Sequence, residues 1–433
     1  MNHAKRIREI IDAMENPIVI HHYDADGIAS GSLVYKSLIE EGKDAEIKAM
    51  RTLTPNDVEE VKDREVIFVD LGSGVEDVNK IKDVVIIDHH QIQGVRKPMI
   101  NPRMFGISGE REASSATTAY AVFRKHVDLA LVGATGDMQI PFIGWNKEVL
   151  KEGIRNGLVK MEFDITLYGR TSRPLIQFLA YSDEPFIDGI SFNEEGVKTF
   201  LDSLNIELKR NEKWLTYSDL EVEEKKRIIS GLIEILIENN RGDEAKNIVG
   251  EVYSLLNRKK RTPLYDPREF ATLLNATGRH GKPELGVRIC LGEENALKEG
   301  TKLLEKHRKM IREGILFAQS VISDEGSYLL IDGRNAISDG IIGIICGMVM
   351  KPYYKKPIIG LSKTNKGTIK ISSRGNKFLI EKGLNLGKVM KRAGATVGGV
   401  GGGHKIAAGA EIEEDKLHIF LDVAGKIIKE QVG

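Results

Sequence analysis

Short runs of valine and isoleucine alternate with stretches of helical spacing through the first third of the chain. The apolar runs lie at residues 18–20, 66–69, 84–87 and 129–132, and the helical patterns include 30–41 and 113–126. Strands that are apolar along nearly their whole length are buried on both faces, which is typical of a parallel sheet covered by helices. We therefore predict an α/β fold class, with an N-terminal parallel-sheet domain over residues 1–160.

The pattern changes twice further along the chain. Longer helical patterns at 223–239, 244–256 and 296–315 predict a helical connector over residues 161–315. Strand signals return at 328–331, 356–361 and 368–372, and a glycine-rich run follows at 397–403. Residues 316–433 are therefore predicted to form a second, smaller α/β domain. A length of 433 residues also favours two or three domains.

Composition excludes several classes of protein. The 63 basic and 63 acidic side chains cancel, so only local basic patches, such as those at 258–261 and 302–312, are available to bind nucleic acid. Both patches are equally compatible with solvated helix faces. Two cysteines cannot form a disulfide framework, which indicates a reducing compartment. The longest apolar stretch, 340–350, is too short to span a membrane, and no signal peptide is visible, so we expect a soluble cytoplasmic protein.

Acidic residues and histidines follow each of the four predicted strands of the first domain. In chain order they are His22, Asp24, Asp26, Asp70, Asp88, His89, His90 and Asp137. The carboxyl ends of parallel strands line one crevice, so these side chains are predicted to converge. Four ionised aspartates in one crevice would raise one another's pKa, and two divalent cations would balance their charge. Imidazole mixed with carboxylates favours manganese, with magnesium as the alternative.

Each part of this series has a simpler interpretation when it is taken alone. Asp-x-Asp-Gly is a common turn, and an aspartate such as Asp70 often caps a helix. Adjacent histidines are often a pair on the protein surface. The ordered set between residues 22 and 137 is much more specific than any one member. We therefore interpret the set as a two-metal centre for phosphoryl transfer.

A second group of candidate residues lies near the C-terminus. Its members are Ser372, Ser373, Arg374, Gly401, Gly402, Gly403 and His404. Glycines let backbone N–H groups approach an anion closely, and a bidentate arginine suits a phosphodiester, so this group is a candidate phosphate-binding site. The glycines lack a following Lys-Ser or Lys-Thr pair, which excludes a P-loop. A flexible hairpin or a tight packing turn is the alternative interpretation of the glycine run.

Together these motifs resemble a known family. The residues His-x-Asp-x-Asp-Gly at 22–27, Asp70, Asp-His-His at 88–90 and Asp137 resemble the DHH phosphoesterase superfamily. The segments 372–374 and 401–409 look like its associated C-terminal substrate-binding domain. In the middle of the chain, residues 168–174 and 273–283 resemble the archaeal RecJ-like branch, which includes the nuclease that associates with the replicative helicase complex. Thr277 stands where that family often has cysteine.

The resemblance implies an exonuclease that uses two manganese or magnesium ions to cleave single-stranded DNA or RNA, in DNA replication or repair. The ligands of one ion would be His22, Asp24 and Asp70, and those of the other Asp26, Asp70, His89 and Asp137. His90 would contact the scissile phosphate, and Asp88 would orient the histidine pair. Arg374 and the glycine loop with His404 would bind the neighbouring phosphate, in a cleft between the two domains that admits one strand. A hydroxide that bridges the metals would be the nucleophile.

Two other functions stay open. The first is a phosphodiesterase for short oligonucleotides or cyclic dinucleotides, against which the long helical middle with its basic clusters argues. The second is a replication scaffold with a vestigial nuclease core, which is disfavoured because all the expected ligand types are present. The replicative helicase accessory complex is a candidate partner by resemblance alone, and polarity of digestion, sugar preference and oligomeric state are not predicted.

Overall fold

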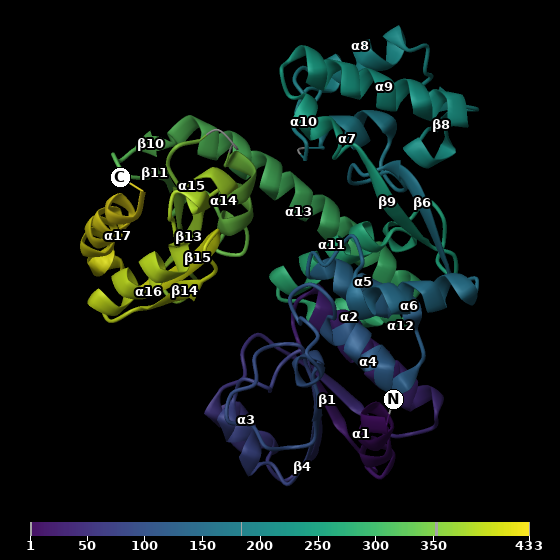
Figure 1. The fold of residues 1–433 in the computed structure, drawn as a ribbon, viewed down its shortest axis with the longest axis vertical. Helices are drawn as coiled ribbons and strands as arrows, with labels where there is room; N and C mark the ends of the chain where they lie inside the picture. Colours follow the sequence, from purple (N-terminus) through teal and green to yellow (C-terminus); the bar gives the residue numbers. More distant parts are fainter. Residues whose placement is uncertain (1, 183, 351–353, 433) are drawn as a thin grey trace. The chain divides into compact units, whose positions relative to one another are not determined.

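The computed structural model describes residues 2–182, 184–350 and 354–432. Its contacts divide the chain into two compact units, Met1–Leu303 and Leu304–Gly433 (Figure 1). Each unit is described separately below. The domain boundaries at residues 160 and 315 that the sequence indicates stay predictions.

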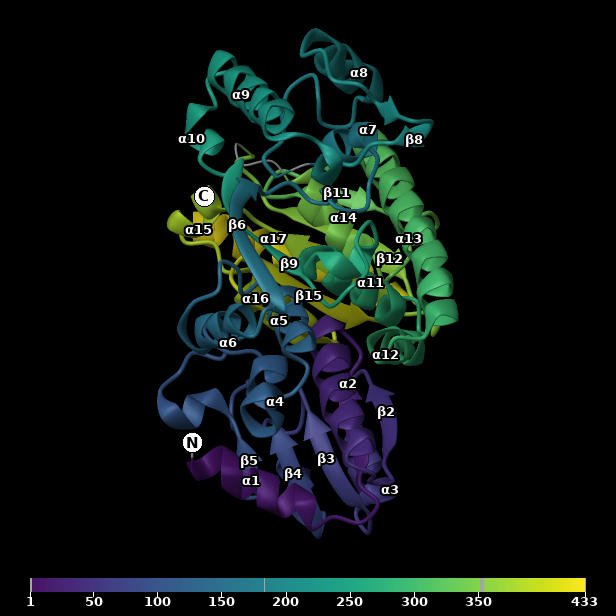
Figure 2. The same cartoon turned by 90° about the vertical axis from the view of Figure 1, so that its right-hand side faces the viewer.

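The first unit contains a five-stranded parallel sheet, which confirms the predicted fold class. The strands are β1 (Ile18–His22), β2 (Glu46–Met50), β3 (Glu65–Val69), β4 (Asp83–Ile87) and β5 (Met99–Ile100). Their order is β2-β1-β3-β4-β5, and every neighbouring pair is parallel. The central strands β1, β3 and β4 are buried on both faces, as their unbroken apolar runs predict. Figure 2 shows β3 and β4 side by side in this sheet.

Helices cover both faces of this sheet. They are α1 (Asn2–Asp12), α2 (Ala25–Glu40), α3 (Pro55–Val61), α4 (Ser115–Phe123), α5 (Val127–Gly136) and α6 (Gly144–Arg155), with the short 3₁₀ helices η1 (Glu76–Lys80) and η2 (Pro102–Phe105). Ile20 and Phe68 point into a core that α3 and η1 complete, whereas α2 packs against β1 and β3 from the other side. The sheet is therefore a layer between two sets of helices.

The strand predicted at residues 129–132 is wrong, because these residues form the middle of α5. All residues from Val127 to Thr135 are buried, and α5 packs against α2, α4, α6 and α11 (Pro267–Arg279). A helix that is buried all round has no polar face, so its sequence lacks the 3.6-residue period and reads as a buried strand.

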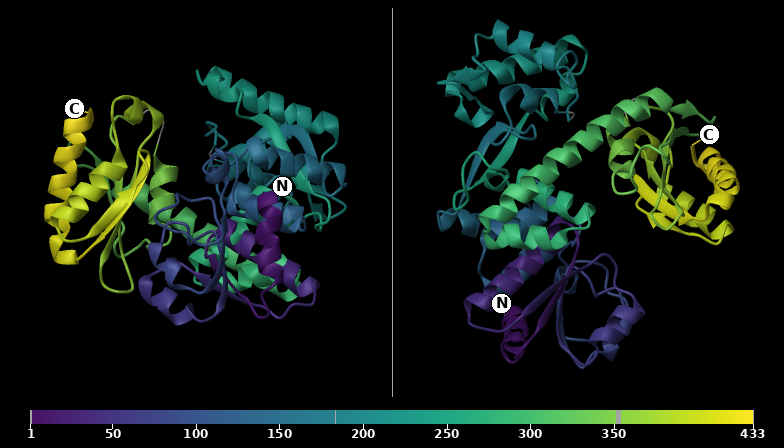
Figure 3. Two further views of the ribbon diagram at one scale, coloured as in Figure 1. Left: turned by 60° about the horizontal axis from the view of Figure 1, so that its bottom comes forward. Right: turned by 180° about the vertical axis from the view of Figure 1, so that it is seen from behind.

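An antiparallel ribbon and a small helical core follow in the first unit (Figure 3, right). The ribbon pairs β6 (Val159–Ile165) with β9 (Val249–Leu255). Between these strands lie α7 (Leu175–Ala180), α8 (Glu194–Ser203), β7 (Lys209–Arg210), β8 (Lys213–Trp214), η3 (Tyr217–Asp219), α9 (Val222–Glu238) and α10 (Gly242–Ala245). Phe178, Leu201, Tyr217 and Leu232 are part of a core that these elements share. After β9 come η4 (Pro263–Tyr265), α11 and α12 (Pro283–Leu291).

The helix predicted over residues 244–256 is also wrong. Only α10 is helical there, and 249–255 is β9. Each residue of β9 pairs with a residue of β6 that lies at least 84 positions earlier, such as Ile165 with Val249. A partner so distant in sequence leaves no signal in the local pattern, so the tertiary pairing overrides it.

The second unit has a mixed six-stranded sheet. Its strands are β10 (Ser323–Asp324), β11 (Leu329–Asp332), β12 (Ile358–Lys363), β13 (Ile369–Arg374), β14 (Val400–Gly403) and β15 (Ala407–Ile412), in the order β10-β11-β12-β13-β15-β14. The helices are α13 (Glu294–Val321), which begins in the first unit, α14 (Ile342–Val349), α15 (Lys377–Glu381), α16 (Leu386–Thr396) and α17 (Leu417–Val432), with η5 (Glu414–Lys416). One core contains residues of α14, and another contains residues of α16 and α17. None of the helices in the described ranges is long and apolar enough to cross a membrane.

Candidate metal centre

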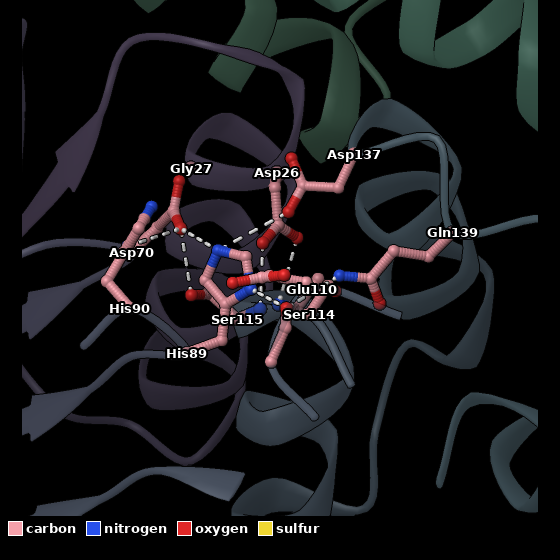
Figure 4. A network of polar contacts seen from close by, with 12 residues as sticks. Asp26, Gly27, Asp70, His89, His90, Glu110, Ser114, Ser115, Asp137 and Gln139 are labelled. Atoms are coloured by element: carbon pink, nitrogen blue, oxygen red, sulfur yellow. Dashed lines mark hydrogen bonds and ion pairs between the residues drawn. The ribbon is translucent and has the colours of Figure 1, made fainter. Parts of the chain in front are cut away.

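The six predicted metal ligands come from the rim of the first sheet and the helices beside it. Figure 4 shows four of them, Asp26, Asp70, His89 and Asp137. His22 ends β1, and Asp24 caps α2, where its Oδ1 accepts a hydrogen bond from Gly27 N at 3.1 Å. Asp26 lies in the first turn of α2, and Asp70 and His89 follow β3 and β4. The sixth residue, Asp137, caps the C-terminus of α5 rather than a strand. Its helix packs on α2, which is why Asp137 still reaches the same rim.

These side chains form two adjacent clusters. His22, Asp24 and Asp70 offer ligand atoms that all lie within 4.8 Å of one another, and so do Asp26, His89 and Asp137. The first cluster contains the residues of the first ligand set that the resemblance implies, and the second contains those of the other set without Asp70. The roles of the individual residues stay proposals, but the structure brings all six together.

Asp70 lies between the two clusters. Its Oδ2 is 3.5 Å from His22 Nδ1, and its Oδ1 is 3.4 Å from His89 Nε2. The backbone of Asp70 is left-handed, with φ 63°. Such a conformation is uncommon for a residue with a side chain and is often found at functional sites. A carboxylate with one oxygen facing each cluster has the geometry that a bridging ligand requires.

Asp88 is committed to hydrogen bonds rather than to a metal. Its Oδ2 accepts bonds from Ser73 N at 3.0 Å and Ser73 Oγ at 2.6 Å. Its Oδ1 accepts bonds from His89 N at 2.7 Å, His90 N at 3.2 Å and His90 Nδ1 at 2.8 Å. A carboxylate with five such donors has little lone-pair density left for a cation, so Asp88 instead fixes the loop and the ring of His90. The His90 side chain is 56% exposed.

A chain of buried amides orients His89. Its Nδ1 is 2.5 Å from Gly109 O, which also accepts a bond from Gln139 Nε2 at 2.9 Å. Gln139 Oε1 in turn accepts a bond from Asn146 Nδ2 at 2.7 Å. With Nδ1 donating to a carbonyl, Nε2 is the nitrogen that faces Asp70 and Asp137, which is the tautomer that a metal ligand needs.

The electrostatics of the clusters favour cations. Burial and the nearby charge of Asp70 raise the pKa of Asp26 to about 7. Burial and Asp26 raise the pKa of Asp137 well above its usual value. Although burial lowers the pKa of His22, its contacts with Asp24 and Asp70 raise it to about 11 overall. These pKa shifts have one cause. Carboxylates that are buried close together hold protons, because the protons supply the positive charge that a bound cation would otherwise provide.

Two buried atoms of the centre, His22 Nδ1 and Asp137 Oδ2, have no hydrogen-bond partner among the residues that the structure describes. Asp137 Oδ2 lies 3.4 Å from His89 Nε2. A buried carboxylate oxygen without a partner costs free energy unless something binds it. This orphaned oxygen, the six mixed oxygen and nitrogen donors and the raised carboxyl pKa values together fit two divalent cations.

The second group of predicted residues lies in the second unit. Ser372 and Ser373 are buried in β13, and the Ser373 hydroxyl donates to Ala408 O at 3.0 Å. Arg374 ends β13, is partly buried, and donates from Nη1 to Ser373 O at 2.9 Å. The exposed His404 follows β14, and its backbone N–H donates to Ala407 O at 2.8 Å.

The glycine run has a packing role that its sequence does not show. It forms β14, an edge strand on which α16 packs very closely. A Cβ atom at Gly401 would lie 2.2 Å from Met390 O, and one at Gly387 would lie 2.2 Å from Gly403 O. At Gly402, however, a Cβ atom would meet nothing within 4 Å. Helix packing therefore accounts for Gly401, whereas Gly402 leaves the backbone of the edge strand open to a ligand.

Two arginines beside the metal centre were not singled out from the sequence. Arg51 follows β2 at the rim of the sheet, and its Cζ lies 5.5 Å from the centre of the Tyr23 ring. Arg279 ends α11 and interacts electrostatically with Tyr23 and Asp24. Both side chains are exposed. Arg51 escaped notice because β2 is a half-exposed edge strand that the apolar pattern did not reveal.

Helix α11 packs closely against the segment between β1 and α2, which carries Asp24. Asn275 Oδ1 accepts a hydrogen bond from Ala25 N at 3.0 Å. A Cβ atom at Gly278 would lie 1.9 Å from Tyr23 O, so only glycine allows this approach. These contacts explain why the 273–283 segment belongs to the site even though it supplies none of the six candidate ligands.

Comparison with known proteins identifies the family of this chain. Three family models match the chain: the DHH family N-terminal domain over residues 16–138, the DHH-CID domain over 167–249 and the DHHA1 domain over 325–430. An uncharacterized protein of Methanocaldococcus jannaschii, MJ0831, is 30% identical over an alignment that covers 100% of this chain and 99% of that protein. The single-stranded-DNA-specific exonuclease RecJ of Escherichia coli is 28% identical over 171 residues, which are 36% of this chain and 29% of the exonuclease.

Solved structures show the same fold. RecJ of Thermus thermophilus in complex with Mn²⁺ has a TM-score of 0.60 at 16% identity, covering 99% of this chain and 54% of that one. CDC45 from Entamoeba histolytica has a TM-score of 0.65 at 13% identity, covering 98% and 97%. The chain thus spans about half of the T. thermophilus RecJ chain and less than a third of the E. coli exonuclease. From the family models, the full-length relative and the fold, we conclude that this chain is a member of the DHH family with a RecJ-like architecture.

Proposed function

We propose that the protein is a metal-dependent exonuclease that hydrolyses phosphodiester bonds of single-stranded DNA or RNA, using two manganese ions with magnesium as the alternative. The observation that carries the proposal is the pair of adjacent ligand clusters, with the Asp70 carboxylate between them. The RecJ relatives support it, since one is described as specific for single-stranded DNA and another was solved with Mn²⁺.

The protein side chains would divide the work among themselves. His22, Asp24 and Asp70 would hold one cation, and Asp26, Asp70, His89 and Asp137 the other. When bound, two such cations activate water and stabilise the charge that develops on the phosphate. The described side chains then have to bind the strand and orient its scissile phosphate.

His90 is the side chain best placed to contact the scissile phosphate. Its Nδ1 is 2.8 Å from Asp88 Oδ1, so the ring is held while the rest of the side chain stays exposed beside the ligand clusters. Its contact with Asp88 raises the pKa of His90, which favours the protonated ring that donates to an anion.

Positive charge next to the centre suits a nucleic-acid backbone. Arg51 lies over the Tyr23 ring, and Arg279 interacts electrostatically with Tyr23 and Asp24. Guanidinium groups bind phosphate in a bidentate manner. In the second unit, Arg374, His404 and the open backbone at Gly402 are proposed to bind a phosphate group. Contacts to the backbone that do not read bases would accept many sequences.

The direct test is a digest of end-labelled single strands of DNA and RNA with Mn²⁺, resolved on a sequencing gel. We expect release of mononucleotides from single strands and little attack on duplex. Asp24→Ala and Asp137→Ala should each abolish hydrolysis while circular dichroism stays unchanged. Asp44→Ala, which changes an exposed aspartate outside the centre, is the matched control and should keep full activity. No release by the wild type, equal attack on duplex, or activity in both site variants would contradict the proposal.

A replication scaffold is the second candidate, and the similarity to CDC45 favours it. A scaffold needs no intact metal centre, whereas all six candidate ligands are present and converge here. A role in replication or repair and binding to the replicative helicase accessory complex stay predictions. If Asp137→Ala abolishes hydrolysis and keeps partner binding, both functions reside in one protein. Preferred cleavage of dinucleotides over long strands would instead indicate an oligonucleotide phosphodiesterase.

A further inference from the structure

We propose that Ser115 is a positioning residue that fixes the orientation of Asp70 and Asp26 and thereby sets the affinity of the centre for its metal ions. The inference rests on the proposed two-metal function. Ser115 is the first residue of α4 and is fully buried, and it is not among the predicted ligands.

Ser115 contacts both carboxylates at once. Its backbone N–H donates to Asp26 Oδ2 at 2.7 Å, and its hydroxyl donates to Asp70 Oδ1 at 2.9 Å (Figure 4). The next residue adds a bond from Ala116 N to Asp26 Oδ1 at 3.0 Å. The N-terminus of α4 therefore binds the Asp26 carboxylate with two N–H groups. The Ser115 hydroxyl connects the same end of the helix to the Asp70 carboxylate.

The hydroxyl bond decides which way the Asp70 carboxylate faces. Asp70 Oδ1 is also the atom 3.4 Å from His89 Nε2, and its Oδ2 faces His22 at 3.5 Å. A bond from Ser115 to Oδ1 holds the carboxylate plane so that each oxygen points to a different cluster. Without the hydroxyl, the carboxylate could rotate about its last side-chain bond, where the barriers are low, and the shared ligand would lose its fixed direction.

A purely structural role for Ser115 makes a different prediction, and the preceding residue provides the comparison. Ser114 is the N-cap of α4, is also fully buried, and accepts a hydrogen bond from Thr117 N at 3.3 Å. Its hydrogen bonds to other described residues stay within α4 and do not reach a carboxylate of the centre. Ser114→Ala should therefore weaken the fold without changing metal affinity, and Ser115→Ala should do the reverse.

The test compares Mn²⁺ binding by the full chain and by the two variants, using isothermal titration calorimetry and electron paramagnetic resonance. Loss of a group that orients a metal ligand typically lowers affinity about 10–100-fold, so we expect a loss of about that size in Ser115→Ala. We also expect the spectrum of a spin-coupled manganese pair in the wild type and in Ser114→Ala, and a weakened pair signal in Ser115→Ala. Ser114→Ala should lower the urea midpoint and keep wild-type affinity.

The outcomes separate this inference from the proposed function. If the wild type binds Mn²⁺ and Ser115→Ala binds it equally well, the role of Ser115 is refuted and the nuclease proposal survives. If the wild type binds no Mn²⁺, both are refuted. Should Ser115→Ala fail to fold, Ser115→Cys offers a near-isosteric replacement with a weaker donor, and wild-type affinity in that variant would equally overturn the inference.

Discussion

Adding one methyl group to α5 tests the geometry of the metal centre. A Cβ atom at Gly133 would lie 2.3 Å from Asp26 Oδ1 and 2.3 Å from Ala116 Cβ. Ordinary van der Waals contacts begin at 3.4 Å, so the neighbours must move by about 1.1 Å, the difference between the two distances. Asp26 and Ala116 belong to the centre and its support, and Asp137 lies at the end of the same helix. Whichever element gives way, a candidate ligand is displaced.

The expected magnitudes follow from two opposing effects. Alanine is a better helix former than glycine by about 1 kcal/mol, and overpacking a tight core costs about 1–3 kcal/mol. Gly133→Ala should therefore lower the free energy of unfolding by up to about 2 kcal/mol. The effect on the rate of hydrolysis should be larger than the effect on stability, because displacing a metal ligand by about 1 Å can lower the rate on the order of 100-fold.

Urea unfolding and Mn²⁺ titration of the same preparations provide the assay, with the rate on a labelled single strand as a third readout. Gly347→Ala in α14 is the matched control, because a Cβ atom there would meet its nearest neighbour, Arg374 Nε, at an ordinary 3.8 Å. The control should gain up to about 1 kcal/mol from helix propensity and keep wild-type Mn²⁺ affinity. Wild-type affinity and rate in Gly133→Ala would refute the packing of α5 against Asp26 as the reason for the glycine.

Three further predictions concern pH, substrate binding and stability. The pKa of Asp26 is raised to about 7 and that of His22 to about 11, so Mn²⁺ must displace protons from its ligands and its affinity should rise with pH through this range. Calorimetry in buffers of different ionisation enthalpy should show proton release, and constant affinity with no release would contradict this. Arg279→Ala should weaken single-strand binding and lower the slope of log affinity against log salt by about 1, as measured by fluorescence anisotropy, whereas an unchanged slope would exclude a phosphate contact. Asp266→Ala should destabilise the first unit by about 3–5 kcal/mol in urea unfolding, because it leaves the buried Arg170, 2.9 Å away, without its counter-ion. The control Glu293→Ala removes one partner of an exposed ion pair and should cost less than about 1 kcal/mol. Equal losses in the two variants would argue against a buried pair.

Much of the N-terminal sheet was determined by the sequence alone. β1, β3 and β4 are apolar on both faces, and only a parallel sheet between two helical layers buries such strands completely. The residues that follow these strands, His22, Asp70 and His89, were predictable as one group because the topology of a parallel sheet brings strand ends to one edge.

The contributions of the other elements depend on packing between segments that are distant in sequence. The fully buried α5 reads as a strand, because burial on all sides removes the periodicity that marks a helix. Asp137 nevertheless joins the centre, since α5 packs on α2 and its end reaches the sheet rim. β9 became a strand through pairing with β6, which lies at least 84 residues earlier.

The contacts that orient the ligands also lie beyond sequence reasoning. Ser115 donates hydrogen bonds to Asp70, which lies 45 positions earlier in the sequence, and to Asp26, which lies 89 positions earlier. The local sequence around a serine at the start of a helix does not indicate such distant partners. The residue types near the strand ends determine which chemistry is available at the site, and they can be identified from the order of residues in the sequence. The direction of each donor and acceptor depends on packing between distant segments, and that is decided only when the chain has folded.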